Sequence, residues 1–157
     1  MKTEWLIVDG YNLLHLEDGF GISIHDLQHA RQQLVREVER VLPEMAIRAT
    51  VVFDGQESGR DWALETSQME VVFSPSNRTA DAVIERMVAD SDHPEHILVV
   101  TSDRVEEQIV SAAGAMVLSC QEFVRRCQTP SHHATNFHKP RGQSRGTLGD
   151  FFPESAE

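Results

Sequence analysis

Apolar residues follow two alternating patterns along the first 127 residues. Short runs of consecutive Val, Ile and Leu predict strands buried on both faces, and segments with apolar residues three and four apart predict helices. The expected strands are Trp5–Val8, Ala49–Phe53, Met69–Phe73, Ile97–Thr101 and Ala115–Leu118; the expected helices are His25–Leu42, a segment capped by Thr79 and running to Ala89, a segment from Asp103 closed by Gly114, and Cys120–Cys127. This alternation predicts an α/β fold with three layers, α/β/α, around a mostly parallel sheet.

Local signals suggest where the helices begin and end. Ser23 followed by Asp26 resembles a capping box at the start of the first long helix. Pro43 is expected to end this helix. Asp103 followed by Glu106 has the same spacing, which gives Glu106 a local role at a helix start.

The periodic pattern fails near residue 129. We therefore expect one domain over residues 1–127, followed by a basic tail of low order over residues 128–157.

Charge is distributed unevenly along the 157 residues, whose net charge is −11. Residues 1–124 carry −13, residues 125–145 carry +5, and the last twelve residues carry −3. A protein that coats nucleic acid without sequence preference would be basic throughout, so this class is excluded. No apolar run approaches the roughly 20 residues of a membrane span, and the N-terminus lacks the pattern of a signal peptide, so we expect a cytoplasmic protein with no membrane contact.

Five carboxylates occupy positions that chemistry would use. Asp9 and Asp54 each end an expected strand, Asp103 follows another, and Asp81 and Glu85 lie one turn apart at the start of a helix. Taken singly, turns and helix starts explain Asp54, Asp81 and Asp103, and a solvated helix face explains Glu85, whereas Asp9 favours a functional role. Parallel strands, however, bring such positions to one edge of a sheet, where like charges repel. A cluster of this kind favours a bound Mg²⁺ or Mn²⁺, whereas the sequence shows no Cys/His set for zinc.

Carboxylate-bound magnesium activates water and neutralises charge on phosphate oxygens, which is the chemistry of phosphodiester hydrolysis. Asn12 can orient such a water or contact a phosphate, and Ser102 can contribute its hydroxyl. Arg78 and Arg104, each beside a candidate acid, can hold phosphate as bidentate forks.

A basic segment follows the last expected helix and contains Arg125, Arg126, Lys139, Arg141 and Arg145. Tails of this composition often lie on RNA phosphates, although a merely solvated tail has the same composition.

Four blocks in this order, IVDGYNLLH, VVFDG, RTADAVIERMV and VVTSDRVEEQIVSAAGA, resemble those of YacP-like NYN-domain proteins within the PIN-like nuclease superfamily. The resemblance implies a PIN-like fold and an Mg²⁺- or Mn²⁺-dependent endoribonuclease that acts on RNA and is associated with the ribosome or translation. By position, it implies catalytic roles for Asp9, Asn12, Asp81 and Asp103. It implies metal ligands at Asp9, Asp81, Asp103 and Glu85, with Asp54 as a secondary member.

Two alternative functions are consistent with the same fold but do not require ribonuclease activity. One is an RNA- or ribosome-binding module of PIN-like fold with little catalysis, and the other is an adaptor that uses its tail. A receiver domain or a haloacid-dehalogenase-like phosphatase is excluded, because each needs a second acid near Asp9 and Tyr11 occupies the relevant phosphatase position.

Overall fold

The computed structural model describes residues 3–16, 26–55, 59–60 and 65–129. Their six strands form one sheet in the order β3-β4-β2-β1-β5-β6. Five strands are parallel, and the short β3 at the edge is antiparallel to β4. The strands are β1 (Thr3–Asp9), β2 (Ala46–Phe53), β3 (Gly59–Arg60), β4 (Met69–Phe73), β5 (Ile97–Val100) and β6 (Met116–Leu118).

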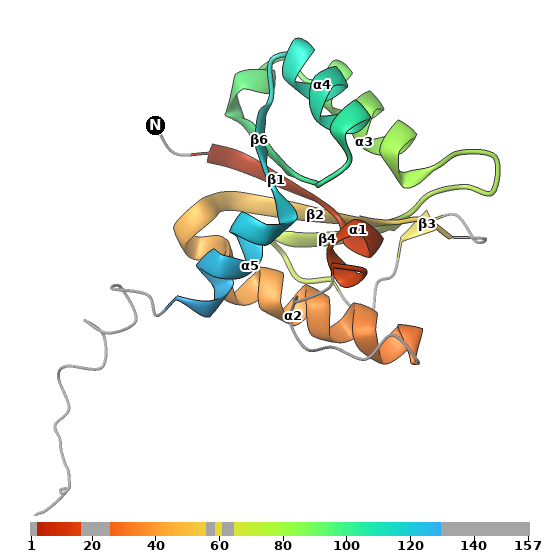
Figure 1. Cartoon of the computed structure of the whole chain (residues 1–157), viewed down its shortest axis with the longest axis vertical. Helices are drawn as coiled ribbons and strands as arrows, with labels where there is room; N and C mark the ends of the chain where they lie inside the picture. The colour runs from red at the N-terminus through yellow and green to blue at the C-terminus, as the bar shows by residue number, and fades with distance from the viewer. Residues whose placement is uncertain (1–2, 17–25, 56–58, 61–64, 130–157) are drawn as a thin grey trace, which may run out of the picture. The chain divides into compact units, whose positions relative to one another are not determined.

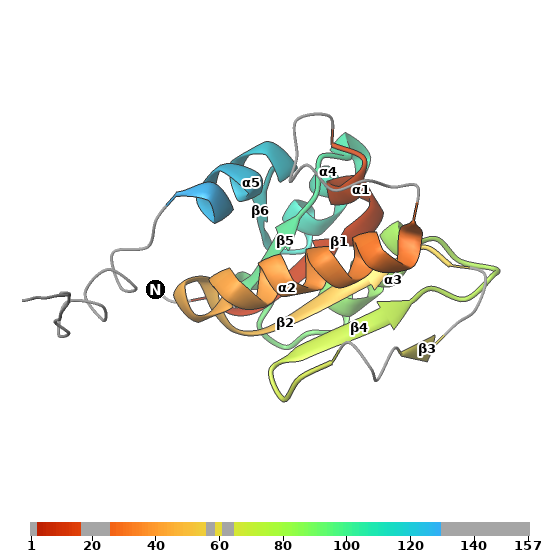
Figure 2. The same ribbon diagram turned by 90° about the horizontal axis from the view of Figure 1, so that it is seen from below.

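Helices cover both faces of the sheet, and this confirms the expected α/β/α layers. The helices are α1 (Gly10–Leu14), α2 (Leu27–Met45), α3 (Ala80–Ala89), α4 (Arg104–Ala112), α5 (Cys120–Gln128) and the 3₁₀ helix η2 (Pro94–His96). Helices α3 and α4 lie on one face, and α2 and α5 lie on the other (Figure 1, Figure 2). Alternate residues of β1 enter two separate cores: Leu6 and Val8 pack on the α2 side, whereas Ile7 packs with Ile84 of α3.

The start and end of α2 differ from the prediction. Its N-cap is Asp26, whose side chain accepts a hydrogen bond from His29 N at 3.1 Å, and Ser23 lies outside the described residues. Pro43 lies within the helix, which continues to Met45. A proline removes one helical hydrogen bond, but the buried Val41 and Leu42 hold the last turn against the core.

Helix α1 was not predicted, because five residues are too few to show a helical period. Asp9 caps it by accepting a hydrogen bond from Asn12 N at 3.4 Å. A Cβ built on Gly10 would lie 2.4 Å from Cε1 of Phe53, so only glycine fits between this turn and β2.

The predicted caps of α3 and α4 are confirmed. Thr79 accepts a hydrogen bond from Ala82 N at 3.1 Å, and Asp103 accepts from the first turn of α4. Gly114 follows α4 with a φ of 109°, a conformation that glycine adopts without strain. In the described ranges, no helix has the length and apolar character needed to cross a membrane.

Candidate active site

Three carboxylates meet beyond the C-terminal end of the sheet. They belong to Asp9 at the end of β1, Asp81 in the first turn of α3 and Glu106 in the first turn of α4. One oxygen from each lies within 4.8 Å of the others. Asp9 is 5% exposed and Glu106 is fully buried, so the acidic group formed by these three residues faces little solvent.

The topology explains why residues this far apart in sequence meet. Strands β1 and β5 are parallel neighbours, with Val8 opposite Val100, so the segments that follow them leave the same edge of the sheet. Asp103 then fixes the start of α4, because its Oδ1 accepts hydrogen bonds from Val105 N at 2.9 Å and Glu106 N at 3.2 Å. This cap sets the direction of α4 and turns the Glu106 side chain toward the core.

Burial and mutual repulsion make full ionisation of the acidic group energetically unfavourable. Loss of water, and then contact with Asp81, raises the pKa of Asp9 to about 7. Burial, and then the charges of Asp9 and Asp81, raise the pKa of Glu106 to about 10. Without a cation, this group retains protons that exposed carboxyls would lose near pH 4.

Glu106 provides the test of whether a metal ion fits. Neither of its buried carboxylate oxygens lies in hydrogen-bond geometry with a described residue, although Asp81 and the Thr101 hydroxyl are near enough to influence its pKa. A contact between two carboxylates becomes a hydrogen bond only if one of them is protonated. Because an unpaired buried carboxylate is strongly unfavourable, a divalent cation held by oxygen ligands matches this donor set. The residues present therefore fit Mg²⁺ or Mn²⁺.

The other predicted metal ligands lie around this group but are not part of it. Asp103 is the N-cap of α4, with Oδ1 already occupied by two backbone amides. Glu85, one turn after Asp81, has a raised pKa because of partial burial and then the charges of Asp81 and Asp103, so these three acids share one local field. Asp54 follows β2 and accepts a hydrogen bond from Ser74 Oγ at 3.0 Å.

Asn12 and Ser102 contact each other directly. The Oδ1 atom of Asn12 accepts from Ser102 N at 2.7 Å and from Cys120 Sγ at 3.2 Å. The Ser102 hydroxyl accepts from Cys120 N at 3.1 Å and contacts Gln121 Oε1 at 3.2 Å. These bonds join the ends of β1 and β5 to the start of α5, so both side chains support the strand ends beside Asp9.

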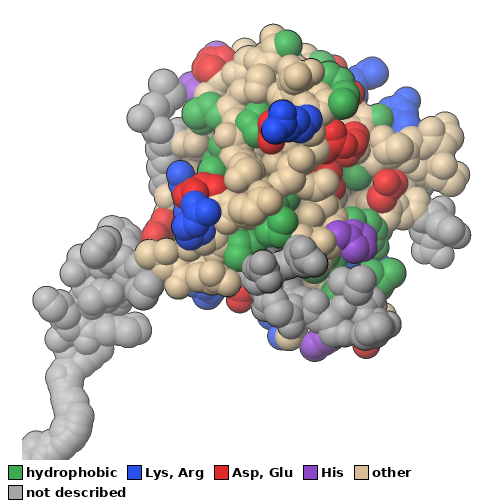
Figure 3. All heavy atoms as spheres, viewed as in Figure 1, with side chains coloured by type: hydrophobic (Ala, Val, Ile, Leu, Met, Phe, Trp, Pro, Cys, Tyr) green, Lys and Arg blue, Asp and Glu red, His purple; other side chains and the backbone are tan. Residues whose placement is uncertain are grey.

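The structure describes only some of the predicted phosphate-binding residues. Arg78 and Arg104 are exposed at the starts of α3 and α4, and neither forms an ion pair with another described residue. Arg125 and Arg126 contact Glu122. Lys139, Arg141 and Arg145 lie outside the described residues. On the face shown in Figure 3, Lys and Arg form separate spots instead of one continuous basic surface.

Glu106 is the site residue that the sequence prediction missed. Its spacing from Asp103 matched a capping box, which supplied a sufficient local explanation. In a capping box, the glutamate would accept a hydrogen bond from Asp103 N. In the structure, Asp103 N donates to Thr101 Oγ1 at 3.1 Å instead. A signal was present, because Glu106 and Val110 are four residues apart and share the buried face of α4.

Comparison with known proteins agrees with this geometry. A family model of the YacP-like NYN domain matches residues 6–151. The chain belongs to this family. YacP of Bacillus subtilis (strain 168) is 30% identical over 130 residues, which cover 79% of this chain and 75% of that protein.

Solved structures support the same assignment to the YacP-like NYN family. The crystal structure of Rae1 (YacP) from Bacillus subtilis matches with a TM-score of 0.68 and 26% identity, covering 86% of this chain and 79% of that one. A point mutant of the same protein matches with a TM-score of 0.62 and 28% identity, covering 80% and 76%. The predicted resemblance is thus confirmed, and the chain carries a domain of a nuclease family.

Proposed function

We propose that this protein is a metal-dependent endoribonuclease that hydrolyses RNA phosphodiester bonds. The observation that carries the proposal is the buried acidic group of Asp9, Asp81 and Glu106, in which Glu106 has no hydrogen-bond partner among the described residues. Membership in a nuclease family supports it independently.

Mg²⁺ or Mn²⁺ would be held by the acidic group, with Asp103 and Glu85 close enough to add negative charge and Asp54 as a further acid at the same edge. When bound, such an ion supplies activated water and neutralises charge on a phosphate oxygen. The protein's own contribution is to hold the three carboxylates close together with little access to solvent. Asn12 and Ser102 fix the strand ends that position Asp9.

In this proposal, RNA recognition depends on a small number of Lys and Arg side chains. Arg78 and Arg104 are available to contact phosphates beside the acidic group, and Lys139, Arg141 and Arg145 add positive charge from the tail. Phosphate neutralisation by Lys and Arg normally supplies affinity for RNA, and a body with a net charge of −13 supplies little of it. We therefore further propose that a larger RNA–protein particle in the cytoplasm, such as the ribosome, presents the RNA.

The first experiment measures cleavage of a pool of single-stranded and structured RNAs with Mg²⁺ or Mn²⁺. Asp9→Asn and Glu106→Gln should each lower the rate by about 10²-fold or more, the range seen when one electrostatic group of a catalytic site is removed. Glu107→Gln is the matched control, because it makes the same chemical change one residue away and outside the acidic group. Equal cleavage by wild type, Asp9→Asn and Glu106→Gln would contradict the proposed site.

A second assay separates the nuclease from a binding module. Wild type that cuts only when ribosomes are added would support presentation by the particle, whereas full activity on short free RNA at physiological salt would contradict it. Binding to ribosomes without cleavage under any metal condition would favour the RNA-binding module. Truncation after Cys127 tests the tail: a nuclease of residues 1–127 keeps its chemistry, whereas an adaptor loses its partner.

A further inference from the structure

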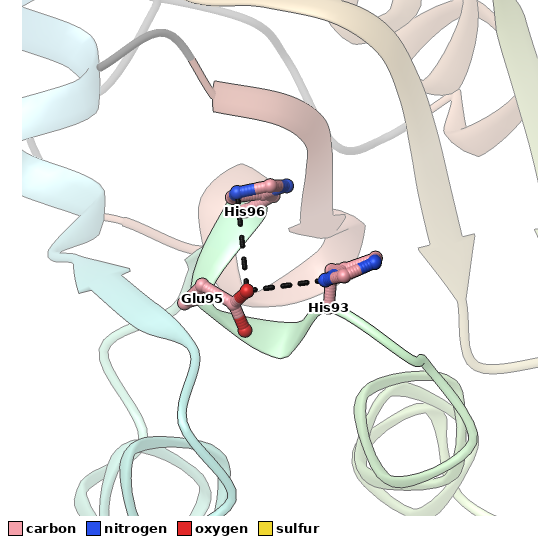
Figure 4. A group of neighbouring side chains, drawn as sticks. All are labelled: His93, Glu95 and His96. Carbon is pink, nitrogen blue, oxygen red and sulfur yellow. Dashed lines mark hydrogen bonds and ion pairs between the residues drawn. The ribbon is translucent and has the colours of Figure 1, made fainter.

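A second group of potential metal ligands lies at the opposite end of the sheet from the acidic group. It consists of His93, Glu95 and His96, whose side chains all come from the segment around η2, immediately before β5 (Figure 4). One ligand atom from each residue lies within 4.8 Å of the others. The sequence HPEH spans a single short 3₁₀ turn of helix, too short to show a periodic pattern.

The distances within this group suit a small cation. Nδ1 of His93 lies 3.2 Å from Oε2 of Glu95, and Nε2 of His96 lies 3.9 Å from the same oxygen. Tetrahedral zinc with bonds near 2.1 Å separates its ligand atoms by about 3.4 Å. The first distance already matches, and the second requires a movement of about half an ångström. The imidazole rings of His93 and His96 stack with their centroids 5.3 Å apart and 17° between their planes, so at least one ring must also rotate for both nitrogens to face one ion.

Glu4 of β1 supplies a separate observation that points to a metal. Its Oε2 lies 3.0 Å from Nδ1 of His96, a buried nitrogen that is close enough for an ion pair with Glu4 but is not aligned for a hydrogen bond. A carboxylate at this distance favours a proton on Nδ1, which leaves on Nε2 the lone pair that a metal ion would need. Histidines that bind metals commonly have this arrangement, with one nitrogen on the ion and the other beside a carboxylate.

The backbone around η2 is held in place before any ligand binds. His93 N donates to Ser91 Oγ at 3.1 Å, and His96 N donates to His93 O at 3.0 Å. Pro94 packs against Gly114, where an added Cβ would lie 3.1 Å from the proline ring. The backbone of this segment therefore needs little ordering to bind an ion, and the cost of ordering falls on the side chains alone.

We propose that His93, Glu95 and His96 bind one Zn²⁺ ion, with Glu4 orienting His96. Two imidazoles and one carboxylate are a known zinc donor set, and the fourth position is left to water. The competing explanation is an ion-pair cluster in which a doubly protonated His96 lies between Glu4 and Glu95. Metal and proton compete for Nε2, so the two explanations predict different responses to zinc.

Zinc binding to the full chain is measured by competition with a chromophoric zinc indicator at pH 7.5, with excess Mg²⁺ present to occupy the acidic group. His93→Ala and Glu95→Gln should each weaken the affinity for one equivalent of zinc by at least about tenfold. Glu4→Gln should weaken the same affinity by about tenfold. His29→Ala is the matched control, because His29 is an exposed histidine on α2, outside the group. Histidines 132, 133 and 138 lie outside the described residues, and any zinc that they bind should be unchanged in all four variants.

Imidazole ¹⁵N NMR gives a readout that does not depend on affinity. Zinc should shift Nδ1 of His93 and Nε2 of His96 in wild type, and should shift them much less in Glu95→Gln at a zinc concentration that only half-saturates the wild type. Identical zinc binding by wild type and His93→Ala, or unshifted His93 and His96 signals at saturating zinc, would overturn the proposal in favour of the ion-pair cluster.

Discussion

Replacing Glu106 with glutamine should stabilise the metal-free protein at alkaline pH. Glu106 is fully buried beside two other carboxyls, so its ionised form is far less favourable in the folded chain than in the unfolded chain. The pKa of Glu106 rises from an ordinary 4.5 to about 10, and that of Asp9 rises from 3.8 to about 7. The folded state therefore binds more protons than the unfolded state above pH 4.5, and stability must fall as pH rises.

The size of the effect follows from these two pKa values. One proton held only in the folded state changes the free energy of unfolding by about 1.4 kcal/mol for each pH unit. Between pH 5 and pH 8, the Glu106 proton alone gives a loss of about 4 kcal/mol as an upper value, because the carboxyls titrate together. Glutamine removes this loss, so Glu106→Gln should exceed wild type by on the order of 3 kcal/mol at pH 8, or roughly 6–12 °C in Tm. At pH 5 the two proteins should be similar.

Thermal unfolding in EDTA at pH 5 and pH 8 is the assay, with Glu107→Gln as the control. Added Mg²⁺ should raise the Tm of wild type at pH 8 and raise that of Glu106→Gln less, because ligand binding stabilises only the folded state with an intact site. A wild type equally stable at both pH values in EDTA, or a Glu106→Gln variant less stable than wild type at pH 8, would refute the account of a strained acidic group.

Three further predictions concern the surroundings of the site. Gly10→Ala should destabilise the protein by about 1–3 kcal/mol in urea unfolding, because its Cβ would meet the Phe53 ring at 2.4 Å; unchanged stability would mean that the ring moves freely. Asn12→Ala should cost about 1–3 kcal/mol by leaving the half-buried Ser102 amide unpaired, and Asn12→Asp should recover part of this loss in the same urea series. Burial raises the pKa of Cys120 to about 11, so its thiol should resist iodoacetamide at pH 8 until the protein unfolds, as peptide mass mapping would show.

The sequence predicted the layers of this fold because its strands and long helices have clear periods. The apolar runs around Val8, Val51 and Val99 are central strands, and all three residues are fully buried. The prediction failed where structure depends on few residues or on packing. Helix α1 and η2 are too short to show a period, and Pro43 lies inside α2 because burial of its neighbours outweighs the lost hydrogen bond.

The candidate site shows a different limit of sequence reasoning. Asp9 was predicted because it ends an apolar strand, and Asp81 because it lies in the first turn of a helix; both also match blocks of the family that the sequence resembles. Glu106 was missed because the Asp103 cap gave it a local role, and only the packing of α4 shows that its carboxylate points inward. A local explanation that suffices for a residue therefore does not exclude a long-range role for it.

The DGYN block shows why some substitutions report on chemistry and others do not. Asp9 both caps α1 and contributes to the acidic group, so removing its side chain would disturb folding and charge together. Asparagine is as good an N-cap as aspartate, so Asp9→Asn keeps the hydrogen bond to Asn12 N and removes only the charge. Changes at Gly10 or Asn12 remove contacts that fix the backbone next to Asp9, so we expect them to shift Asp9 itself. Lost cleavage in those variants would therefore reflect geometry, whereas lost cleavage in Asp9→Asn, with unchanged urea unfolding, would reflect the carboxylate.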